Sequence, residues 1–174
     1  MKTLILGGVR SGKSRLAERL AAGTGKPVTY VATATAGNDA EMAARIAAHQ
    51  ARRPAGWALV EEPLALAAAL RTHARADACV LVECLTLWLT NLLVDDDAAA
   101  LEREQVALLA ALDELPGELI LVGNETGMGI VPLGELTRRY CDAAGRLHQD
   151  IAARCGRVLL TVAGLPLALK GDLP

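Results

Sequence analysis

Short runs of apolar residues alternate along the chain with longer stretches in which apolar residues recur every three or four positions. The runs predict β-strands, and the recurring spacing predicts amphipathic helices. The predicted strands cover residues 3–7, 28–33, 58–61, 79–83, 119–123 and 157–162, with an edge strand in the tail. The predicted helices cover residues 14–22, 39–52, 64–71, 85–94, 98–115 and 133–154, the last with a weak point at Gly145.

The order of these elements predicts an α/β fold. Strands that are apolar almost throughout, separated by helices, are typical of a mostly parallel central sheet with helices on both faces. The chain shows no internal repeat or low-complexity linker, so we expect a single domain over residues 1–174. Ligands of such sheets bind beyond the carboxyl ends of the strands. Functional residues are therefore expected just after residues 6, 33, 61, 83 and 123.

The composition narrows the class of protein. Hydrophobic residues make up 52% of the chain and charged residues 22%, with a net charge of -2, as expected for a globular protein. Basic runs are short and aromatic residues reach only 2%, which argues against a nucleic-acid partner. No CxxC pair or zinc-site spacing occurs, so we expect reduced and mostly buried thiols at Cys79, Cys84, Cys141 and Cys155.

Membrane and targeting signals are weak in this sequence. The most apolar stretch, residues 85–94, is too short to span a bilayer and is broken by Thr90 and Asn91. The residues before Gly7 lack the order of charged, apolar and small residues that a signal peptide has. We therefore expect a cytoplasmic protein with no membrane span.

The first predicted strand runs into a glycine-rich motif that opens a helix. Residues 7–14, GGVRSGKS, fit G-x-x-x-x-G-K-[ST] in the strand–loop–helix context that this motif requires. The glycines let the backbone wrap around phosphate oxygens, and amide groups at the helix start point at the anion. Lys13 is expected to reach the β- and γ-phosphates, and the Ser14 hydroxyl to ligate Mg²⁺. The predicted fold is thus P-loop NTPase-like; the alternative is a chance glycine turn.

A carboxylate that works with this phosphate loop is expected at the end of another central strand. Residues 79–83, CVLVE, place Glu83 there, where such folds more often carry aspartate. Glu83 could hold Mg²⁺ through water or accept a proton from an attacking hydroxyl. The alternative is a solvated carboxylate at a strand end.

The predicted helix 39–52 carries a histidine among arginines. Glu41, Arg45, His49 and Arg53 follow at steps of four residues and line one face, which in most helices is simply solvated. This helix, however, follows a strand whose carboxyl end is expected beside the phosphate loop. Neighbouring guanidiniums also disfavour protonation, and a neutral imidazole is suited to attack a nucleotide phosphorus. The weaker candidates are the other histidines, His73 in a predicted polar loop and His148 on the long helix.

These motifs resemble those of a known family. The runs LGGVRSGKS, YVATAT, DAEMAARIAAHQARRPAGW, VEE, LVECLTLWLTNLL and NETGMGIVP follow one another over nearly the whole chain. In this order they are similar to adenosylcobinamide kinase/adenosylcobinamide-phosphate guanylyltransferase. The phosphate loop is shared by many enzymes, whereas ARIAAHQARRPAGW and NETGMGIVP are much more particular.

The resemblance implies a bifunctional enzyme of cobalamin biosynthesis. Such an enzyme phosphorylates the aminopropanol hydroxyl of adenosylcobinamide with ATP or GTP, with Mg²⁺. It then transfers GMP from GTP to the adenosylcobinamide phosphate, which gives adenosylcobinamide-GDP and pyrophosphate. Family members are reported as homo-oligomers, often trimers, so the resemblance implies a homo-oligomer here as well.

The resemblance also implies roles for single residues. A histidine of the family becomes covalently guanylylated, and the match places this role on His49, with Lys13 and Glu83 as the other catalytic residues. The implied nucleotide contacts are Gly7, Gly8, Val9, Arg10, Ser11, Gly12, Lys13, Ser14, Thr33, Ala34, Thr35, Gln50, Ala51, Arg52, Arg53, Glu61 and Glu83.

This sequence departs from the family pattern in one place and is ambiguous in another. Some relatives have two adjacent histidines, whereas Ala48 precedes His49 here, which removes ambiguity about the nucleophile and a helper base with it. Glu61 and Glu62 are both available as the acidic contact, and the offset from Trp57 favours Glu61.

The segment NETGMGIVP, residues 124–132, leaves the end of the predicted strand 119–123. Gly127 and Gly129 permit close approach of the backbone to a ligand, and Asn124 and Glu125 could bind substrate hydroxyls or amides. The alternative is a glycine turn packed by Met128 and Ile130.

Two other functions remain open. An ordinary small-molecule kinase would use the phosphate loop and leave His49 as a surface residue. A nucleotide-dependent switch would bind nucleotide without any transfer chemistry, although the chain lacks the long partner-binding segments that such a module needs.

Overall fold

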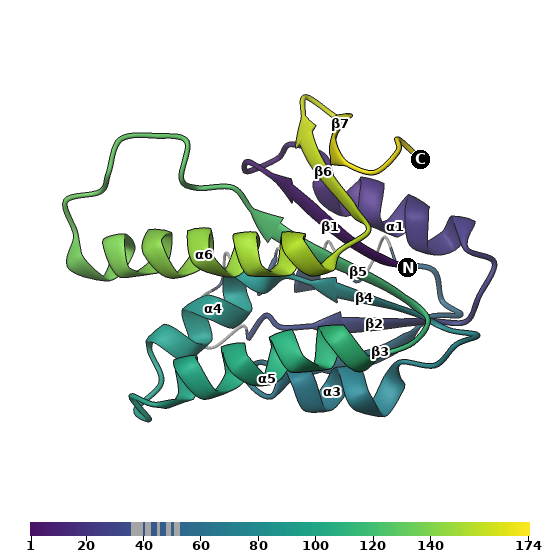
Figure 1. The fold of residues 1–174 in the computed structure, drawn as a ribbon, viewed down its shortest axis with the longest axis horizontal. Helices are drawn as coiled ribbons and strands as arrows, with labels where there is room; N and C mark the ends of the chain where they lie inside the picture. The colour runs from purple at the N-terminus through teal and green to yellow at the C-terminus, as the bar shows by residue number, and fades with distance from the viewer. Residues whose placement is uncertain (36–39, 41–42, 45, 48–49, 51–52) are drawn as a thin grey trace.

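The computed structural model of the chain describes residues 1–35, 40, 43–44, 46–47, 50 and 53–174. These residues form one sheet of seven strands in the order β3-β2-β4-β5-β1-β6-β7 (Figure 1). The strands are β1 (Lys2–Gly7), β2 (Val28–Ala32), β3 (Ala58–Glu61), β4 (Cys79–Glu83), β5 (Glu118–Asn124), β6 (Arg157–Val162) and β7 (Leu165–Lys170). The helices are α1 (Lys13–Gly23), α3 (Leu66–His73), α4 (Leu85–Leu93), α5 (Ala100–Glu114) and α6 (Glu135–Arg154).

The sheet is parallel except at one edge. Strands β1 to β6 pair in parallel, and β7 pairs antiparallel with β6. The two strands β6 and β7 are joined by Ala163 and Gly164, whose φ angles of 52° and 80° are both positive. Two such residues form the tight turn whose twist suits a β-hairpin. The predicted edge strand in the tail is thereby confirmed.

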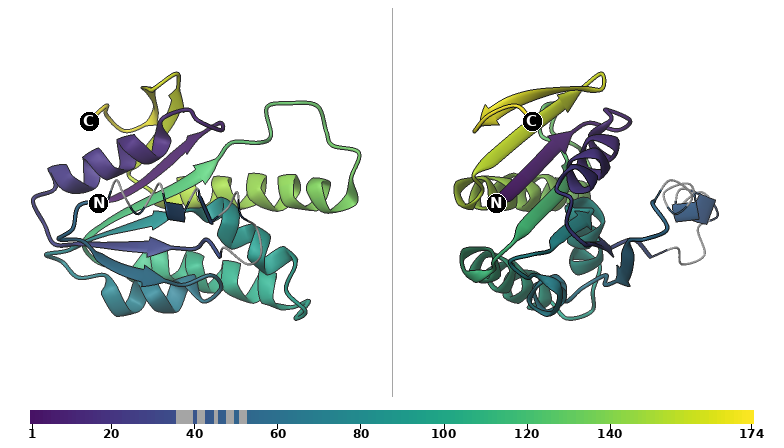
Figure 2. Two further views of the ribbon diagram at one scale, coloured as in Figure 1. Left: turned by 180° about the vertical axis from the view of Figure 1, so that it is seen from behind. Right: turned by 90° about the vertical axis from the view of Figure 1, so that its right-hand side faces the viewer.

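Helices cover both faces of the sheet, as expected from strands that are apolar throughout. Figures 1 and 2 show α1 on one face and α3, α4, α5 and α6 on the other. Successive side chains of a strand point to opposite faces, and β1 divides its apolar residues in this way. Leu4 and Leu6 join the core cluster under α3 to α6, while Ile5 joins the cluster under α1. The α/β class and the mostly parallel sheet are confirmed.

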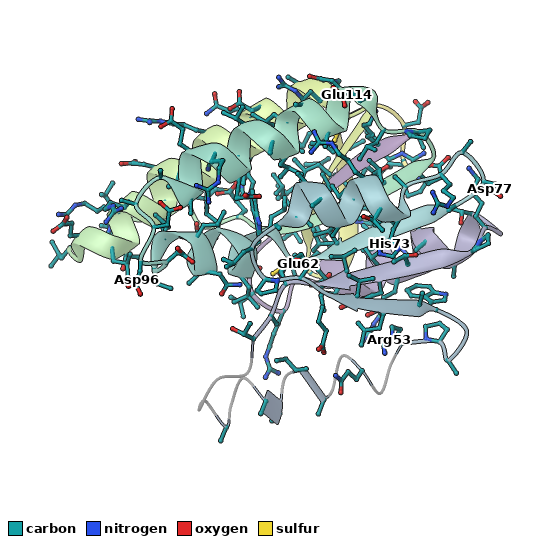
Figure 3. The ribbon with its side chains drawn as sticks, turned by 90° about the horizontal axis from the view of Figure 1, so that it is seen from below. Arg53, Glu62, His73, Asp77, Asp96 and Glu114 are labelled. Carbon is teal, nitrogen blue, oxygen red and sulfur yellow. The ribbon has the colours of Figure 1, made fainter. Side chains whose placement is uncertain are left out.

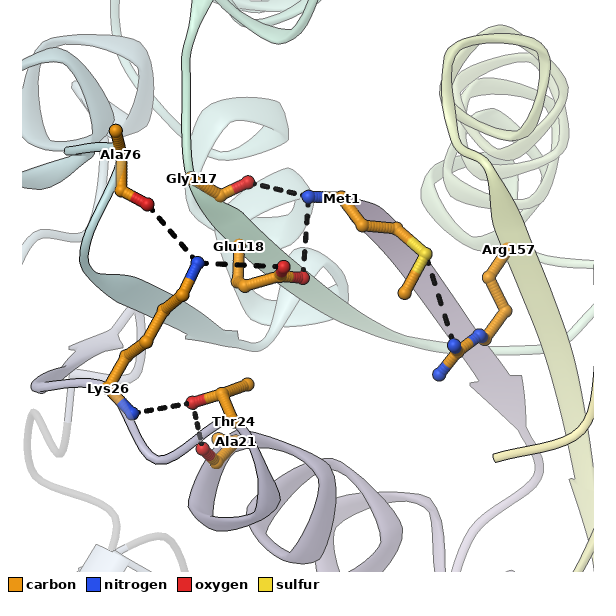
Figure 4. Close-up of polar contacts among 8 residues, drawn as sticks. All are labelled: Met1, Ala21, Thr24, Lys26, Ala76, Gly117, Glu118 and Arg157. Atoms are coloured by element: carbon orange, nitrogen blue, oxygen red, sulfur yellow. Dashed lines mark hydrogen bonds and ion pairs between the residues drawn. The ribbon is translucent and has the colours of Figure 1, made fainter.

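The amino ends of the strands are held by polar contacts (Figure 4). The Met1 amine donates to the Gly117 carbonyl at 2.7 Å and lies 3.3 Å from the Glu118 carboxylate. Lys26 lies 3.7 Å from Glu118 and donates to the Ala76 carbonyl. These contacts join the starts of β1 and β5 to the turn before β2. They lie at the amino ends of the strands, whereas the phosphate loop lies at the carboxyl ends.

Strand boundaries agree with the sequence-based prediction to within a residue, and helix boundaries to within two. The predicted weak point at Gly145 is wrong, because α6 runs unbroken from Glu135 to Arg154. Of the predicted helix 39–52, residues 40, 43–44, 46–47 and 50 are helical, and the others lie outside the described residues. Among the described residues, no helix has both the length and the apolar character needed to cross a membrane.

Candidate functional site

The glycine-rich motif forms a closed loop between β1 and α1. Ser11 N donates to Gly8 O at 3.2 Å, and Gly12 takes a φ of 96°, which favours glycine. A Cβ atom on Gly7 would lie 2.6 Å from the Thr161 carbonyl oxygen, so the close packing of the loop on β6 requires a glycine there. The loop is also tied to the β6–β7 turn, because Gly164 N donates to Ser11 O at 2.8 Å.

The positive charge of the loop is directed inward. Lys13 is only 8% exposed, and its ammonium donates to Gly8 O at 3.2 Å, so the side chain folds back over the loop. The amide groups of the first turn of α1 lack partners within the helix and face the same region. A lysine ammonium and a helix amino terminus together attract phosphate oxygens.

Ser14 and Glu83 meet beside this loop. Strand β5 lies between β1 and β4, so the end of β4 is two strands away from the phosphate loop. The Ser14 hydroxyl, at the start of α1, donates to Glu83 Oε1 at 2.8 Å. A hydroxyl and a carboxylate are the hard oxygen donors that Mg²⁺ prefers, and they lie next to the phosphate-binding backbone. This donor set fits a magnesium ion bound together with nucleotide phosphates.

The end of β2 is locked to the end of β4. Thr33 has no exposed surface; its hydroxyl donates to the Cys84 carbonyl at 2.7 Å and accepts from Cys84 N at 2.9 Å. Of the two residues that follow, Ala34 is half-buried and Thr35 is exposed. Sequence reasoning missed this hydrogen-bonding pair, because Thr33 and Cys84 lie 51 positions apart and no local pattern connects them.

Part of the predicted nucleotide contact set lies outside the described residues. This applies to Ala51 and Arg52, and also to the predicted nucleophile His49 and its neighbour Arg45. Gln50 is exposed, and its carbonyl accepts from Arg53 N at 3.3 Å.

Arg53, labelled in Figure 3, lies with its guanidinium 5.5 Å from the ring centre of Tyr30 on β2. Burial, and secondly the Glu83 carboxylate, raise the pKa of the Tyr30 phenol, which therefore stays neutral. Because β2 pairs with β4, the Arg53 cation lies against the strand next to the one that carries Glu83.

The two adjacent acidic residues after β3 differ in what they contact. Glu62 Oε1 accepts from Leu64 N at 2.9 Å and from Ala65 N at 2.7 Å, just before α3 (Figure 3). Glu61, the last residue of β3, is exposed at the carboxyl edge of the sheet. Of the two carboxylates, Glu62 is thus committed to the turn before α3.

The segment 124–132 begins beside the phosphate loop. Asn124 is the register partner of Gly7, and Glu125 N donates to Gly7 O at 3.1 Å. The alternative of a turn packed by two apolar side chains is wrong, because Met128 is 76% and Ile130 97% exposed.

The two described histidines lie on helices. His73 is the last residue of α3 and not part of a polar loop, so that expectation is wrong (Figure 3). His148 lies on α6 as predicted, and burial lowers its pKa.

The sheet, the phosphate loop and the strand-end carboxylate define a P-loop NTPase-like protein. Two solved structures share the fold. RadB recombinase superposes with a TM-score of 0.52 at 17% identity, over 91% of this chain and 73% of that one. The structure described as "Structural study of Project ID PH0250 from Pyrococcus horikoshii OT3" superposes with a TM-score of 0.53 at 9% identity, over 99% of this chain and 87% of that one.

Sequence comparison defines the family within this class. Residues 3–169 match the family described as cobinamide kinase / cobinamide phosphate guanyltransferase, and the chain belongs to this family. It is 67% identical to the bifunctional adenosylcobalamin biosynthesis protein CobP of Pseudomonas aeruginosa, over 99% of both chains. It is 40% identical to the bifunctional adenosylcobalamin biosynthesis protein CobU of Escherichia coli, over 98% of this chain and 100% of that one.

Proposed function

We propose that this protein catalyses two successive steps of cobalamin biosynthesis at one nucleotide site. In the first, the γ-phosphoryl group of ATP or GTP passes to the aminopropanol hydroxyl of adenosylcobinamide. In the second, GMP passes from GTP to the resulting phosphate, giving adenosylcobinamide-GDP and pyrophosphate. The observation that carries the proposal is the phosphate loop with Ser14 and Glu83 in contact beside it, in a chain of this family.

For the kinase step, the chain supplies positioning and charge. Lys13 and the first amides of α1 bind the β- and γ-phosphates, and residues 7–12 wrap the phosphate chain. Ser14 and Glu83 hold Mg²⁺, which when bound neutralises charge on the transferred group. Glu83 has a second candidate role, since a carboxylate at this place can take the proton of the attacking hydroxyl.

For the guanylyl step, we assign the nucleophile to His49. Its neutral imidazole nitrogen attacks the α-phosphorus of GTP, the bond to the bridging oxygen breaks, and pyrophosphate leaves. The phosphate of the corrinoid substrate then displaces the imidazole. Arg45, Arg52 and Arg53 stabilise the charge on the migrating group. Support comes from family membership, from the arginine-rich sequence around His49 and from the place of Arg53 next to β2.

The remaining nucleotide contacts are proposed from the family resemblance. In this proposal the nucleotide is also contacted by the segment after β2, with Thr33, Ala34 and Thr35, and by Gln50, Ala51 and Arg52. Glu61 is favoured over Glu62 as the acidic contact, because Glu62 already accepts two backbone hydrogen bonds. We further propose that the chain is one functional domain and works in the cytoplasm as a homo-oligomer, with a trimer as the first candidate.

The test is the intact mass of the protein after mixing with GTP and Mg²⁺. Wild-type protein should gain the mass of one GMP group, and His49→Ala should gain none while still phosphorylating cobinamide. His148→Ala, which removes a histidine from α6, serves as the matched control and should keep the adduct.

The three candidate functions separate in this experiment. Phosphorylated cobinamide without any adduct would favour an ordinary kinase. Failure to consume GTP in the presence of cobinamide would favour a nucleotide-dependent switch. A His49→Ala variant that still carried GMP would refute the assignment of the nucleophile.

A further inference from the structure

Thr33, which is fully buried, forms hydrogen bonds to the backbone of Glu83 and of Cys84, the residue that follows it. Thr33 makes three hydrogen bonds to the end of β4. Its backbone N donates to the Glu83 carbonyl at 3.1 Å, and its hydroxyl both donates to the Cys84 carbonyl and accepts from Cys84 N. The donor and an acceptor position of this hydroxyl are therefore both used by one residue, the one directly after Glu83.

An asparagine on α4 holds Thr33 in turn. Asn91 Nδ2 donates to the Thr33 carbonyl at 2.9 Å and to the Pro63 carbonyl at 3.1 Å. On the same helix, the indole of Trp88, which has no exposed surface, donates to the Leu64 carbonyl at 2.7 Å. Helix α4 thus fastens the residues that follow β2 and β3, while its own start follows the end of β4.

These contacts determine where the Glu83 side chain starts. The Glu83 carbonyl is bound by Thr33 N, and both polar backbone groups of Cys84 are bound by the Thr33 hydroxyl, so the backbone on the carboxyl side of Glu83 cannot rotate freely. The Glu83 carboxylate accepts from Ser14 at 2.8 Å on the other side. Glu83 is thus held both at its backbone carbonyl and at its side-chain carboxylate, so the carboxylate keeps one position relative to the phosphate loop.

We propose that Thr33 and Asn91 are positioning residues, whose side chains set the place of Glu83 for the transfer chemistry without touching the substrate themselves. This inference rests on the proposed role of Glu83. It gives the Thr33 hydroxyl a task different from the nucleotide contact that the family resemblance implies, since this hydroxyl is inaccessible and bonded to the Cys84 backbone. Displacing a catalytic group by about 1 Å can cost on the order of 100-fold in rate.

The test is a double-variant cycle between Thr33 and Glu83, read as kcat of the kinase step. Thr33→Val removes the hydroxyl at equal volume and should lower kcat by about 10- to 100-fold, with little change in KM for the nucleotide. Thr33→Ser keeps the hydroxyl and should restore most of the activity. In a Glu83→Gln background, Thr33→Val should cause no further loss, because the group that it positions is already disabled.

Two more variants separate positioning from general stability. Asn91→Ala, at a half-buried position of α4, should lower kcat in the wild-type background. When it is combined with Glu83→Gln, it should cause no further loss of kcat. It also provides the cycle if Thr33→Val does not fold. Thr29→Val, which removes a hydroxyl from β2 four residues before Thr33, is the matched control and should leave kcat unchanged. Assays are run below the melting temperature of every variant, measured by circular dichroism.

The outcomes distinguish the positioning role of Thr33 from the catalytic role of Glu83 on which it rests. Equal fold-losses from Thr33→Val with and without Glu83→Gln would show that Thr33 acts independently, and would overturn the positioning role alone. A Thr33→Ser variant as impaired as Thr33→Val would do the same, because the hydroxyl would then not matter. Full activity of Glu83→Gln itself would instead overturn the proposed role of Glu83.

Discussion

Single atoms decide the shape of the phosphate loop. Gly7 ends β1 with the Thr161 carbonyl oxygen so close that even a methyl group has no room. That oxygen belongs to the backbone of β6, a strand paired with β1, so it cannot move aside as a flexible side chain would. The first glycine of the motif is thus required by packing against a neighbouring strand.

At this scale we predict that Gly7→Ala disables the protein. The added methyl group must push the loop away from β6, so we expect loss of nucleotide binding and a lower free energy of unfolding by about 1–3 kcal/mol. Isothermal titration with GTP and urea unfolding measure the two effects. Gly23→Ala, at the open end of α1, is the control and should preserve both. Normal nucleotide affinity in Gly7→Ala would mean that the loop tolerates the shift.

At the scale of elements, the connection between β3 and α3 separates two neighbouring carboxylates. Glu62 serves the turn before α3, where it accepts two backbone hydrogen bonds, and Glu61 stays exposed at the edge where nucleotide is proposed to bind. Helix α4 completes this connection, because Trp88 and Asn91 hold the residues between the two carboxylates and α3.

We therefore predict opposite effects for the two alanine variants. Glu62→Ala should lower the free energy of unfolding by about 1–3 kcal/mol, because two half-buried backbone donors lose a charged acceptor, and should leave the affinity for GTP close to wild type. Glu61→Ala should leave stability unchanged and weaken GTP binding. Thermal unfolding and titration of each variant provide the comparison. The reverse pattern would transfer the nucleotide contact to Glu62.

At the scale of the whole molecule, buried thiols lie on both sides of the sheet. Cys79 and Cys84 belong to the core cluster under α1, and Cys155 belongs to the cluster under the other helices. Burial raises the pKa of each of these thiols to about 11. The expectation of mostly buried cysteines is confirmed, with Cys141 only half-buried, and the structure joins none of the four in a disulfide.

This distribution predicts that the fold weakens in alkaline solution. The thiols ionise near their ordinary pKa of 9.0 in the unfolded chain and only near 11 in the folded one. The unfolded state therefore binds fewer protons in this window, and the free energy of unfolding falls as pH rises from about 9 to about 11. Urea midpoints at a series of pH values measure the loss. Cys155→Ala should make this decline with pH shallower than in the wild type; a decline as steep as that of the wild type would contradict the explanation.

Much of the fold could be predicted from local pattern, because each strand and helix carries its own periodicity. The errors were local as well. Gly145 does not interrupt α6, since the packing of Ala144, Leu147 and Ile151 outweighs the low helix propensity of one glycine. His73 completes α3 where the polar sequence predicted a loop. The guanylylation role of His49 stays a prediction, because this residue lies outside the described part of the chain.

The sequence by itself determined the element order, the parallel sheet, the phosphate loop and the family, because these depend on residues close together in the chain or on whole-chain similarity. Only the tertiary structure decided that Ser14 meets Glu83, that Thr33 holds the residue after Glu83 and is itself held by Asn91, and that Glu62 is occupied while Glu61 is exposed. Such contacts join residues tens of positions apart or depend on the exact direction of a strand end. Their physical basis is the pairing order of the strands, which brings the carboxyl ends of strands that are far apart in the sequence to the same end of the sheet.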